Sequence, residues 1–432
     1  MKKAYYIEAE ELAARGPDAV PLELLSPTHL IYSSPATLAY NSPGAEGFGV
    51  KRAGLAIPGS VMLLVSPGCC GRNTSLVSSM REYHNRFFYL LMDETDIVTG
   101  RHLRRIPDAV EEVCQSLETP PSVVMICITC VDALLGTDME RVCRKAEERV
   151  GLPVRPCYMY ALTREGRRPP MVHVRQSIYS LLTPRKKHGD AVNLLGFFAP
   201  LIDDCEIYDL LRGAGVRQIR EISRCRDFAE YEKMAEANFN LVLHPEARFA
   251  AADFEKKLNI PSIELTRLYQ TDRLERQYRA LGAALGVRFE ADEAKRRADA
   301  EAEAFARDYR GLAFGVGECL NADSFELSLT LLRLGLRVPE IYGTVTEENF
   351  VWIRRIAEIS PHTRIYSNLA PTMLWYDEAD SDVEITIGKD AGYYHPSVPG
   401  IPWNSDRQPY GYAGVRKLFG ELRGAMEGGV RL

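Results

Sequence analysis

Two adjacent cysteines, Cys69 and Cys70, follow the apolar run at 61–65 in the stretch SPGCCGRNTS. Gly68 and Gly71 flank the pair and predict a turn in which the backbone can approach a bulky group closely. Turn amides can also donate hydrogen bonds to sulfide. A disulfide between neighbouring cysteines is strained, and a buried structural thiol needs no glycine turn. We therefore interpret the pair as candidate ligands of a metal or redox centre.

A third thiol, Cys130 in ITCVDALLGTDME, follows another expected strand at 122–129. The carboxyl ends of parallel strands lie at one edge of a sheet, so we expect Cys130 near Cys69 at that edge. The alternative for each cysteine is a buried core thiol, which is the interpretation we favour for Cys127. Two thiols are too few for a four-iron cluster, which normally takes four cysteine ligands. A symmetric dimer would supply two from each subunit.

Four further residues are candidates for binding or proton transfer. His244 closes an expected strand in NLVLHPEA, although a lone histidine is more often a hydrogen-bonded structural residue. His395 and Trp403 belong to an aromatic, Pro- and Gly-rich stretch at 388–414, which predicts an ordered cover over a pocket or an interface. Cys319 lies in GVGECL, a turn that could cradle phosphate but lacks the third glycine of the dinucleotide motif.

Other catalytic and nucleotide motifs are missing from the sequence. It contains no GxxxxGK[ST] phosphate loop, so we expect no nucleotide bound by this chain, and no GxSxG nucleophile elbow.

These residues are spaced by a repeating pattern of apolar run, polar or Gly/Pro turn and amphipathic helix. Continuous Val/Ile/Leu runs are typical of parallel strands that are covered on both faces. The pattern predicts an α/β fold with three Rossmann-like, doubly wound domains and mostly parallel sheets. The expected strands are 61–66, 122–129, 191–198, 218–223, 240–244, 262–265, 312–316, 338–342, 363–367 and 383–388.

Domain boundaries are expected where composition changes. The polar, basic stretch at 183–190 and the charge-dense stretch at 285–310 suggest a linker and one long solvated helix. We predict an N-terminal domain with the thiols at 1–187, a middle domain at 188–305 and a C-terminal domain with the aromatic tail at 306–432. The expected helices are 108–117, 139–150, 207–214, 228–237 and 325–334.

Composition narrows the functional class of the 432-residue chain. A net charge of −6 shows no basic excess for nucleic acid. There is no stretch of 18 apolar residues and no apolar signal-peptide region after MKKAYY, so we expect neither a membrane partner nor export. Ten cysteines without an export signal favour reduced thiols in the cytoplasm.

With these residues in place, the chain resembles the nitrogenase component 1 family over nearly its whole length. SPGCC resembles the family's glycine-cysteine motif, and ITCVDALLGTDMERV resembles its "ECPIGLIGDDIE" motif, whose cysteine is a cluster ligand. The remaining similar stretches are ETDIVTGRHLRRIPDAVEEV, NLLGFF, LVLHPEARFAAADFEKKLNIPSIEL and PWNSDRQPYGYAGV.

Three departures from the family pattern change what the resemblance implies. Leu38 or a neighbour stands where the family has its first interface cysteine, ahead of Cys69. His244 and Ile401 stand at the positions of the two metal-cofactor ligands of the dinitrogen-reducing protein. We therefore expect no dinitrogen reduction. A [4Fe-4S] cluster shared between two subunits fits better than an eight-iron cluster, with Cys130 and Cys69 or Cys70 as the ligands from each.

The resemblance implies the catalytic component of an ATP-dependent, two-component reductase that forms a homodimer or pairs with a related subunit. A separate ATP-hydrolysing iron-sulfur partner would deliver electrons through the interface cluster to a small-molecule substrate, such as a tetrapyrrole, in the central cleft between the three Rossmann-like domains. His244 and His395 are the expected proton donors there, and Cys319 and Trp403 the expected substrate contacts. The alternative is a non-catalytic scaffold that holds an iron-sulfur or metal cofactor during its assembly. A third class, a solute- or metal-chelate-binding protein, is less favoured because no export signal is found.

Overall fold

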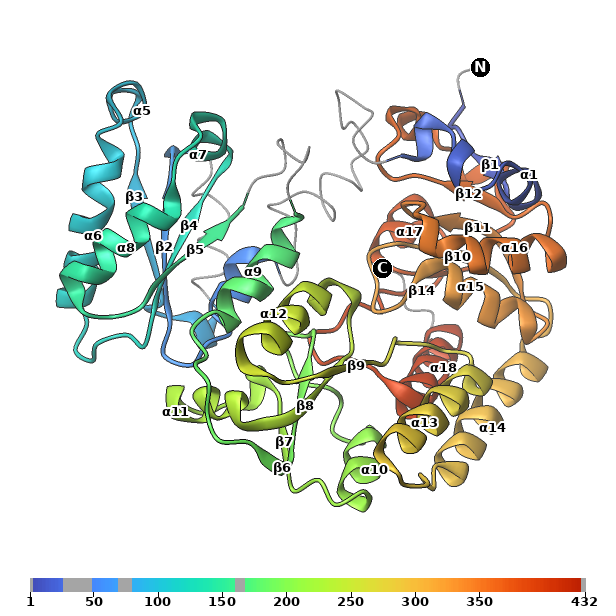
Figure 1. Cartoon of the computed structure of the whole chain (residues 1–432). Helices are drawn as coiled ribbons and strands as arrows, with labels where there is room; N and C mark the ends of the chain where they lie inside the picture. Colours follow the sequence, from blue (N-terminus) through green and yellow to red (C-terminus); the bar gives the residue numbers. More distant parts are fainter. Residues whose placement is uncertain (1–2, 26–48, 69–79, 160–167, 429–432) are drawn as a thin grey trace. The chain divides into compact units, whose positions relative to one another are not determined.

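The computed structural model describes residues 3–25, 49–68, 80–159 and 168–428 (Figure 1). The chain divides into two compact units, which we call unit 1 (residues 1–47, 201–215 and 267–432) and unit 2 (residues 48–200 and 216–266). Cys69, Cys70 and Leu38 lie outside the described residues, so the interpretations placed on them stay predictions. The three predicted domain boundaries likewise stay predictions.

Unit 2 contains two parallel sheets in its described residues, with the strand orders β3-β2-β4-β5 and β7-β6-β8-β9. Its strands are β2 (Val61–Ser66), β3 (Phe87–Leu91), β4 (Val124–Ile128), β5 (Val154–Tyr158), β6 (His188–Leu195), β7 (Gln218–Arg220), β8 (Ala237–Val242) and β9 (Ser262–Glu264). Its helices are α2 (Val50–Gly54), α5 (Glu94–Thr99), α6 (His102–Ser116), α7 (Cys130–Leu135), α8 (Met139–Val150), α9 (Pro170–Tyr179), α11 (Phe228–Glu232) and α12 (Arg248–Leu258).

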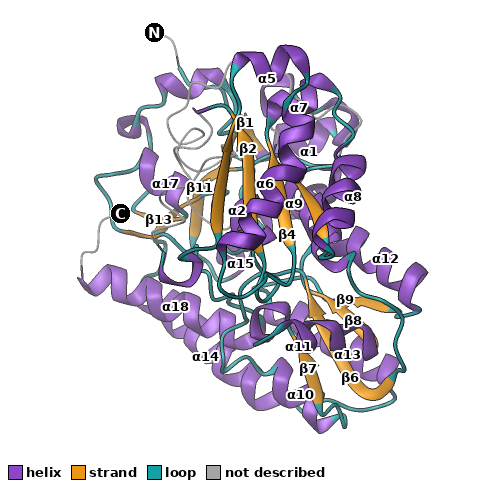
Figure 2. Ribbon diagram, turned by 90° about the vertical axis from the view of Figure 1, so that its left-hand side faces the viewer, coloured by secondary structure: helices purple, strands orange, loops and turns teal. Residues whose placement is uncertain are grey.

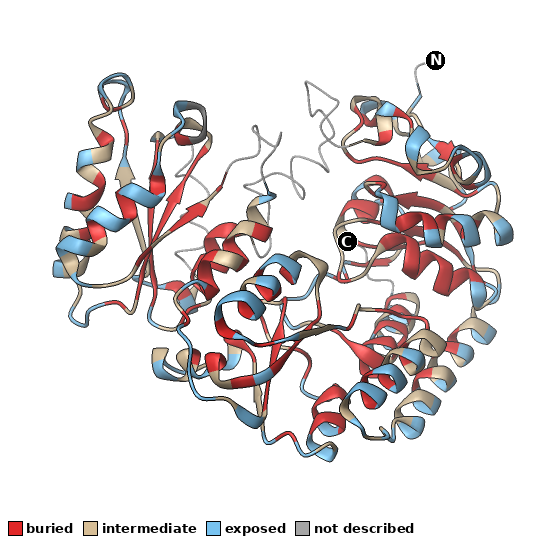
Figure 3. Ribbon diagram, viewed as in Figure 1, coloured by how far each residue is buried: buried red, intermediate tan, exposed pale blue. Residues whose placement is uncertain are grey.

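The first sheet of unit 2 is covered on both faces because its strands are apolar throughout. Alternate residues of β2 point to opposite faces: Val61, Leu63 and Val65 join the core formed with α6 and α8. Met62 and Leu64 join a second core, which continues through α2, α9 and α12 to the other sheet (Figures 2 and 3). A strand that is buried on both faces needs no polar alternation, which explains the run VMLLV.

Unit 1 contains the sheet β1-β12-β11-β10-β13-β14, in which β1 alone pairs antiparallel among the described strands. Its strands are β1 (Ile7–Glu8), β10 (Ala313–Val316), β11 (Arg337–Tyr342), β12 (Arg364–Tyr366), β13 (Ile385–Ile387) and β14 (Gly400–Ile401). Its helices are α1 (Ala9–Arg15), α10 (Ile207–Gly213), α13 (Thr271–Leu285), α14 (Asp292–Asp308), α15 (Ser324–Arg333), α16 (Phe350–Ile359), α17 (Lys389–Tyr394) and α18 (Gly411–Gly428).

The predicted fold class, α/β with mostly parallel sheets, is confirmed. Each strand expected from sequence is present with small changes at its ends. Within the part of the chain that the structure describes, no helix combines the length and the apolar character needed to cross a bilayer.

Two helices begin at residues other than those predicted. The expected solvated helix at 285–310 is α14 alone, which starts at Asp292 and buries Ala298, Ala302 and Phe305 on one face. These residues recur at helical spacing and form an apolar face. The small side chain of alanine makes that face hard to recognise in the sequence. The helix expected at 108–117 begins at His102 instead, and Pro107 lies inside it.

Candidate functional site

Each parallel sheet has one point at which the order of its strands reverses. In open α/β sheets, ligands bind beyond the carboxyl ends of the strands at this switch point. The reversal lies between β2 and β4 in the first sheet, between β6 and β8 in the second, and between β10 and β13 in the third. The structure therefore offers three places at which to look for functional side chains.

Cys130 lies at the switch point of the first sheet. Val65 of β2 pairs with Ile128 of β4, so both strands end at the same edge. Cys130 follows two residues later as the first residue of α7, and it is half-buried. By contrast, Cys127 on β4 and Cys157 on β5 are fully buried, and burial raises the pKa of the Cys157 thiol well above its ordinary value.

A buried polar cluster lies beside Cys130. His102, at the start of α6, places its Nδ1 3.0 Å from the carbonyl oxygen of Asp96, so this nitrogen carries a proton. Its Nε2 lies 3.2 Å from Oδ1 of Asp132, two residues after Cys130. Burial raises the pKa of the Asp132 carboxyl. Oγ1 of Thr129, Nε2 of His102 and Oδ2 of Asp132 are buried without a well-aligned hydrogen bond among the described residues.

Asp96 joins this cluster to two half-exposed arginines, Arg101 and Arg105. Its carboxylate accepts a hydrogen bond from Arg101 Nε at 2.6 Å and a second from Arg105. It also forms a capping box with Asp93 at the start of α5. The Arg101 hydrogen bond lowers the pKa of Asp96 to about 2, so the carboxylate stays ionised.

His244 lies at the switch point of the second sheet, directly after β8. Gly196, which follows β6, has φ of +129°, and a Cβ there would lie 2.8 Å from the Cβ of His244. The backbone N–H of Glu246 donates to His244 Nδ1 at 3.3 Å, so the imidazole proton is on Nε2. The His244 side chain is 37% exposed. Buried Arg175 fixes this corner, because it donates to the Gly196 carbonyl at 3.0 Å and to Glu246 at 2.7 Å.

The switch point of the third sheet is filled by a carboxylate of the chain itself. Asp390, after β13, accepts hydrogen bonds from the backbone N–H groups of Glu318 and Cys319 at 2.7 and 3.0 Å. A Cβ on Gly317 would lie 2.1 Å from Asp390 Oδ1. The turn GVGECL therefore directs its amides to Asp390 and not to a phosphate. Burial raises the pKa of the Cys319 thiol, which weakens it as a nucleophile or ligand.

His395 is held inside unit 1 by a buried glutamate. Its Nε2 lies 3.1 Å from Oε2 of Glu340, which also accepts hydrogen bonds from the hydroxyls of Tyr342 and Tyr376 at 2.6 and 2.7 Å. Arg364 forms an ion pair with Oε1 at 2.8 Å. His395 is only 2% exposed, so its immediate surroundings are these side chains.

Trp403 is also buried in unit 1. Its φ of +38° is unusual for a residue with a side chain. Its Nε1–H donates to the hydroxyl of Tyr269 at 2.8 Å, which in turn donates to the Asn321 carbonyl at 2.7 Å. The backbone N–H of Asn321 donates to the Trp403 carbonyl at 2.7 Å, which closes the loop.

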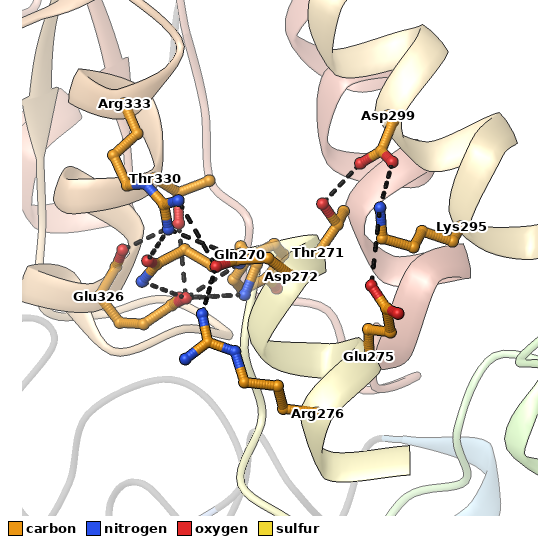
Figure 4. A network of polar contacts seen from close by, with 11 residues as sticks. Gln270, Thr271, Asp272, Glu275, Arg276, Lys295, Asp299, Glu326, Thr330 and Arg333 are labelled. Carbon is orange, nitrogen blue, oxygen red and sulfur yellow. Dashed lines mark hydrogen bonds and ion pairs between the residues drawn. The ribbon is translucent and has the colours of Figure 1, made fainter. Parts of the chain in front are cut away.

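Glu326 forms a network that sequence analysis did not single out (Figure 4). Its carboxylate on α15 accepts hydrogen bonds from the backbone N–H groups of Tyr269 and Gln270, which precede α13, each at 3.0 Å. Burial raises the pKa of Glu326 to about 7, although these hydrogen bonds lower it. A cavity of about 200 Å³, lined by Gln270, Asp272 and Arg333 among others, lies beside this junction. A lone Glu on an apolar helix was the available sequence signal.

The residues around Cys130 fit one ligand position of an iron-sulfur cluster. The thiol is half-buried at a switch point, and the buried Thr129 hydroxyl has no hydrogen-bond acceptor among the described residues, so it is available as a donor to a cluster sulfide. Within the described ranges, no three His, Cys, Asp or Glu side chains gather to hold a metal ion. The described residues by themselves therefore form no complete cluster site.

The sequence matches a family model described as "Nitrogenase component 1 type Oxidoreductase" over residues 46–427. Among curated proteins, it is 25% identical over 416 residues to the nitrogenase iron-molybdenum cofactor biosynthesis protein NifE of Mesorhizobium japonicum, covering 90% of this chain and 82% of that protein. It is also 25% identical to NifE of a Nostoc species, covering 55% of this chain and 52% of that protein. NifE of Klebsiella pneumoniae matches at 28% identity over 46% of each chain. The chain thus spans about half the length of the Nostoc and Klebsiella relatives.

A solved structure, "Nitrogenase Cp1 at pH 6.5", has the same fold. It aligns with a TM-score of 0.70 over 95% of this chain and 96% of the other, at 17% sequence identity.

Proposed function

Because the chain belongs to the nitrogenase component 1 type oxidoreductase family, we propose that it is the catalytic component of an ATP-dependent, two-component reductase. The observation that supports this most directly is the half-buried thiol of Cys130 at a switch point, beside buried polar groups that have no well-aligned hydrogen bond within the described ranges. An ordinary core cysteine, such as Cys127 in the preceding strand, is fully buried instead.

The proposed metal ligands are Cys130 and either Cys69 or Cys70, from each of two subunits. When bound, a [4Fe-4S] cluster supplies one-electron transfer. The role of the chain is then to fix the Cys130 turn, and the contact between His102 and Asp132 joins the first turns of α6 and α7 for that purpose. A separate iron-sulfur ATPase would serve as the partner, in keeping with the lack of a phosphate-loop motif here.

His244 is the stronger of the two proposed proton donors. Its Nε2 carries the proton, because Nδ1 accepts from the Glu246 backbone. Its side chain is 37% exposed, whereas His395 is 2% exposed and engaged with Glu340. Proton donation by a positioned imidazole suits the reduction of a small molecule, such as a tetrapyrrole, that takes up protons with its electrons.

The first experiment measures iron and sulfide in anaerobically prepared protein. We expect Cys130→Ser to lose most of the iron, and one of Cys69→Ser and Cys70→Ser to do the same. Cys114→Ser is the matched control, because Cys114 is also half-buried on a helix of unit 2 but lies away from the switch point. Wild-type iron content in Cys130→Ser would contradict the proposed ligand set.

A cofactor-assembly scaffold is the second candidate, and one observation favours it. The curated relatives named above are cofactor biosynthesis proteins. Turnover with a family reductase component and ATP separates the two functions. A reductase gives many product molecules per chain, whereas a scaffold transfers its metal cluster to an acceptor protein once and forms no product.

A further inference from the structure

Six tyrosines form a continuous cluster in unit 1, which we call the tyrosine cluster. The ring centroids of Tyr6 and Tyr366 are 5.5 Å apart, those of Tyr366 and Tyr342 5.4 Å, those of Tyr342 and Tyr394 4.9 Å, and those of Tyr394 and Tyr393 5.5 Å. The sixth ring, Tyr376, lies 5.6 Å from Tyr366 and 5.1 Å from Tyr394. Each ring in this series therefore lies within ordinary contact distance of the next ring.

The cluster runs from the surface through the interior and back to the surface. Tyr6 is 40% exposed and Tyr393 is 43% exposed, so both ends reach solvent. Tyr342, Tyr366 and Tyr394 between them are buried. A core that needed only apolar volume would be filled by Phe or Leu, without hydroxyl groups that each require a partner.

Two phenols of the cluster, Tyr342 and Tyr376, share one proton acceptor. Oε2 of Glu340 accepts from Tyr342 and Tyr376 at 2.6 and 2.7 Å, and His395 Nε2 lies within 3.0 Å of both hydroxyls. Burial raises the pKa of Glu340, but hydrogen bonds from His395 and the two tyrosines outweigh it, and the pKa lies below its ordinary value. The carboxylate is therefore ionised and able to accept a proton.

We propose that the tyrosine cluster is a one-electron relay, in which Glu340 takes the phenolic proton when Tyr342 or Tyr376 is oxidised. An oxygen-derived radical at the surface takes one electron from an end tyrosine and becomes its anion. The oxidised end tyrosine releases its phenolic proton to water. An electron from Tyr342 or Tyr376 then returns to that ring, which takes a proton back from water. The O–H bond of the donor breaks, and its proton moves to Oε2 of Glu340 to leave a neutral phenoxyl radical. A small thiolate then returns one electron and becomes a thiyl radical, and the proton returns from Glu340 to the tyrosine.

The coupling to Glu340 is what makes the relay chemically reasonable. A phenol that loses an electron becomes strongly acidic, and its oxidation is easier when a base already accepts its hydrogen bond. Burial keeps the resulting radical away from solvent and from other chains. Arg364, in its ion pair with Oε1, holds the acceptor in place through the cycle. This inference is independent of the metal site in unit 2.

The test uses pulse radiolysis of the full chain with azide radicals, which oxidise exposed Trp and Tyr and become azide anions. Trp375 is 41% exposed and directly precedes Tyr376 of the cluster, so it reports on entry of the oxidising equivalent. We expect tryptophan radical absorbance to convert to phenoxyl absorbance at a rate independent of protein concentration. The double variant Tyr342→Phe/Tyr376→Phe should slow this conversion about tenfold or more, and Glu340→Gln should also slow it.

Tyr278→Phe is the matched control, because buried Tyr278 also donates to a carboxylate, Glu206, at 2.6 Å, but its ring meets Tyr412 outside the cluster. It should leave the rate unchanged. Conversion at the wild-type rate in the double variant, or equal slowing in Tyr278→Phe, overturns the proposal. If Glu340→Gln does not fold, the wild-type rate in heavy water decides: slower conversion supports a proton transfer coupled to oxidation of the phenol, and an unchanged rate contradicts the proposal.

Discussion

Cys130 and Cys127 are close in sequence but have different surroundings. Cys127 lies three residues earlier, yet its place in the middle of β4 buries it on a sheet that is covered on both faces. Cys130 comes after the strand has ended, where the chain turns into α7. Position relative to a strand end therefore separates a core thiol from a candidate ligand.

Some neighbours of Cys130 escaped sequence analysis because their partners are distant. His102 lies 30 positions from Asp132 along the sequence, and neither residue belongs to a motif that marks it as buried. A charged residue in the apolar stretch CVDALL was the available signal. The same holds for Glu340, whose partners His395 and Tyr376 lie on other elements.

At the residue scale, Glu326 predicts a pH-dependent stability. Its pKa is about 7 in the folded chain against an ordinary 4.5, so the folded state binds this proton more tightly than the unfolded state. The contribution to stability is full below about pH 4.5 and is lost as pH rises through about 7, a change of about 3 kcal/mol at most. Thermal melting between pH 5 and 8 should show wild type losing stability relative to Glu326→Gln.

The control for this profile is Glu303→Gln. Glu303 is exposed on α14, so its substitution should leave the pH profile parallel to that of wild type. Parallel profiles for Glu326→Gln and wild type would show that Glu326 does not titrate in this range.

At the element scale, three elements differ from the prediction, and a proline explains one of these differences. Pro156 disfavours a strand at 154–158, yet β5 is an edge strand of its sheet, where a residue without an N–H is tolerated. The helix expected at 228–237 ends early, as α11 gives way to a short 3-10 turn and β8 begins at Ala237. β3 is absent from the expected strands although FFYLL is a clear apolar run.

Two glycines should respond in opposite ways to the same substitution. Gly317→Ala would place a methyl group 2.1 Å from Asp390 Oδ1, which three hydrogen bonds to its carboxylate hold in place. We expect a loss of about 2–4 kcal/mol in the free energy of unfolding. Gly420 lies in α18, and a methyl group added there would have no neighbouring atom within 4 Å, so Gly420→Ala should gain about 0.5–1 kcal/mol. Denaturant titration measures both, and equal signs would contradict this assignment of the two sites.

At the scale of the whole molecule, a shared cluster fixes the ratio of iron to chain. Four irons held between two subunits give about two irons per chain. If the chain pairs with itself, light scattering of the chain prepared alone and anaerobically should report a dimer. A monomer would indicate that the second subunit is a related chain. Four or more irons per chain would instead indicate a larger or additional cluster.

The chain alone should not hydrolyse ATP, because the phosphate-loop motif is missing from its sequence.

The sequence by itself determined the elements and the turns that follow them, because apolar periodicity and Gly/Pro turn chemistry act over a few residues. It also carried the family resemblance, and it placed Cys130 just past its strand and His244 at the end of its strand. Only the tertiary structure decided the order of the strands, and with it which strand ends lie at a switch point. It alone brought Glu340, His395 and the tyrosine cluster together, because those contacts join residues up to 360 positions apart. Local sequence patterns carry no information about such pairings, which depend on how the whole sheet assembles.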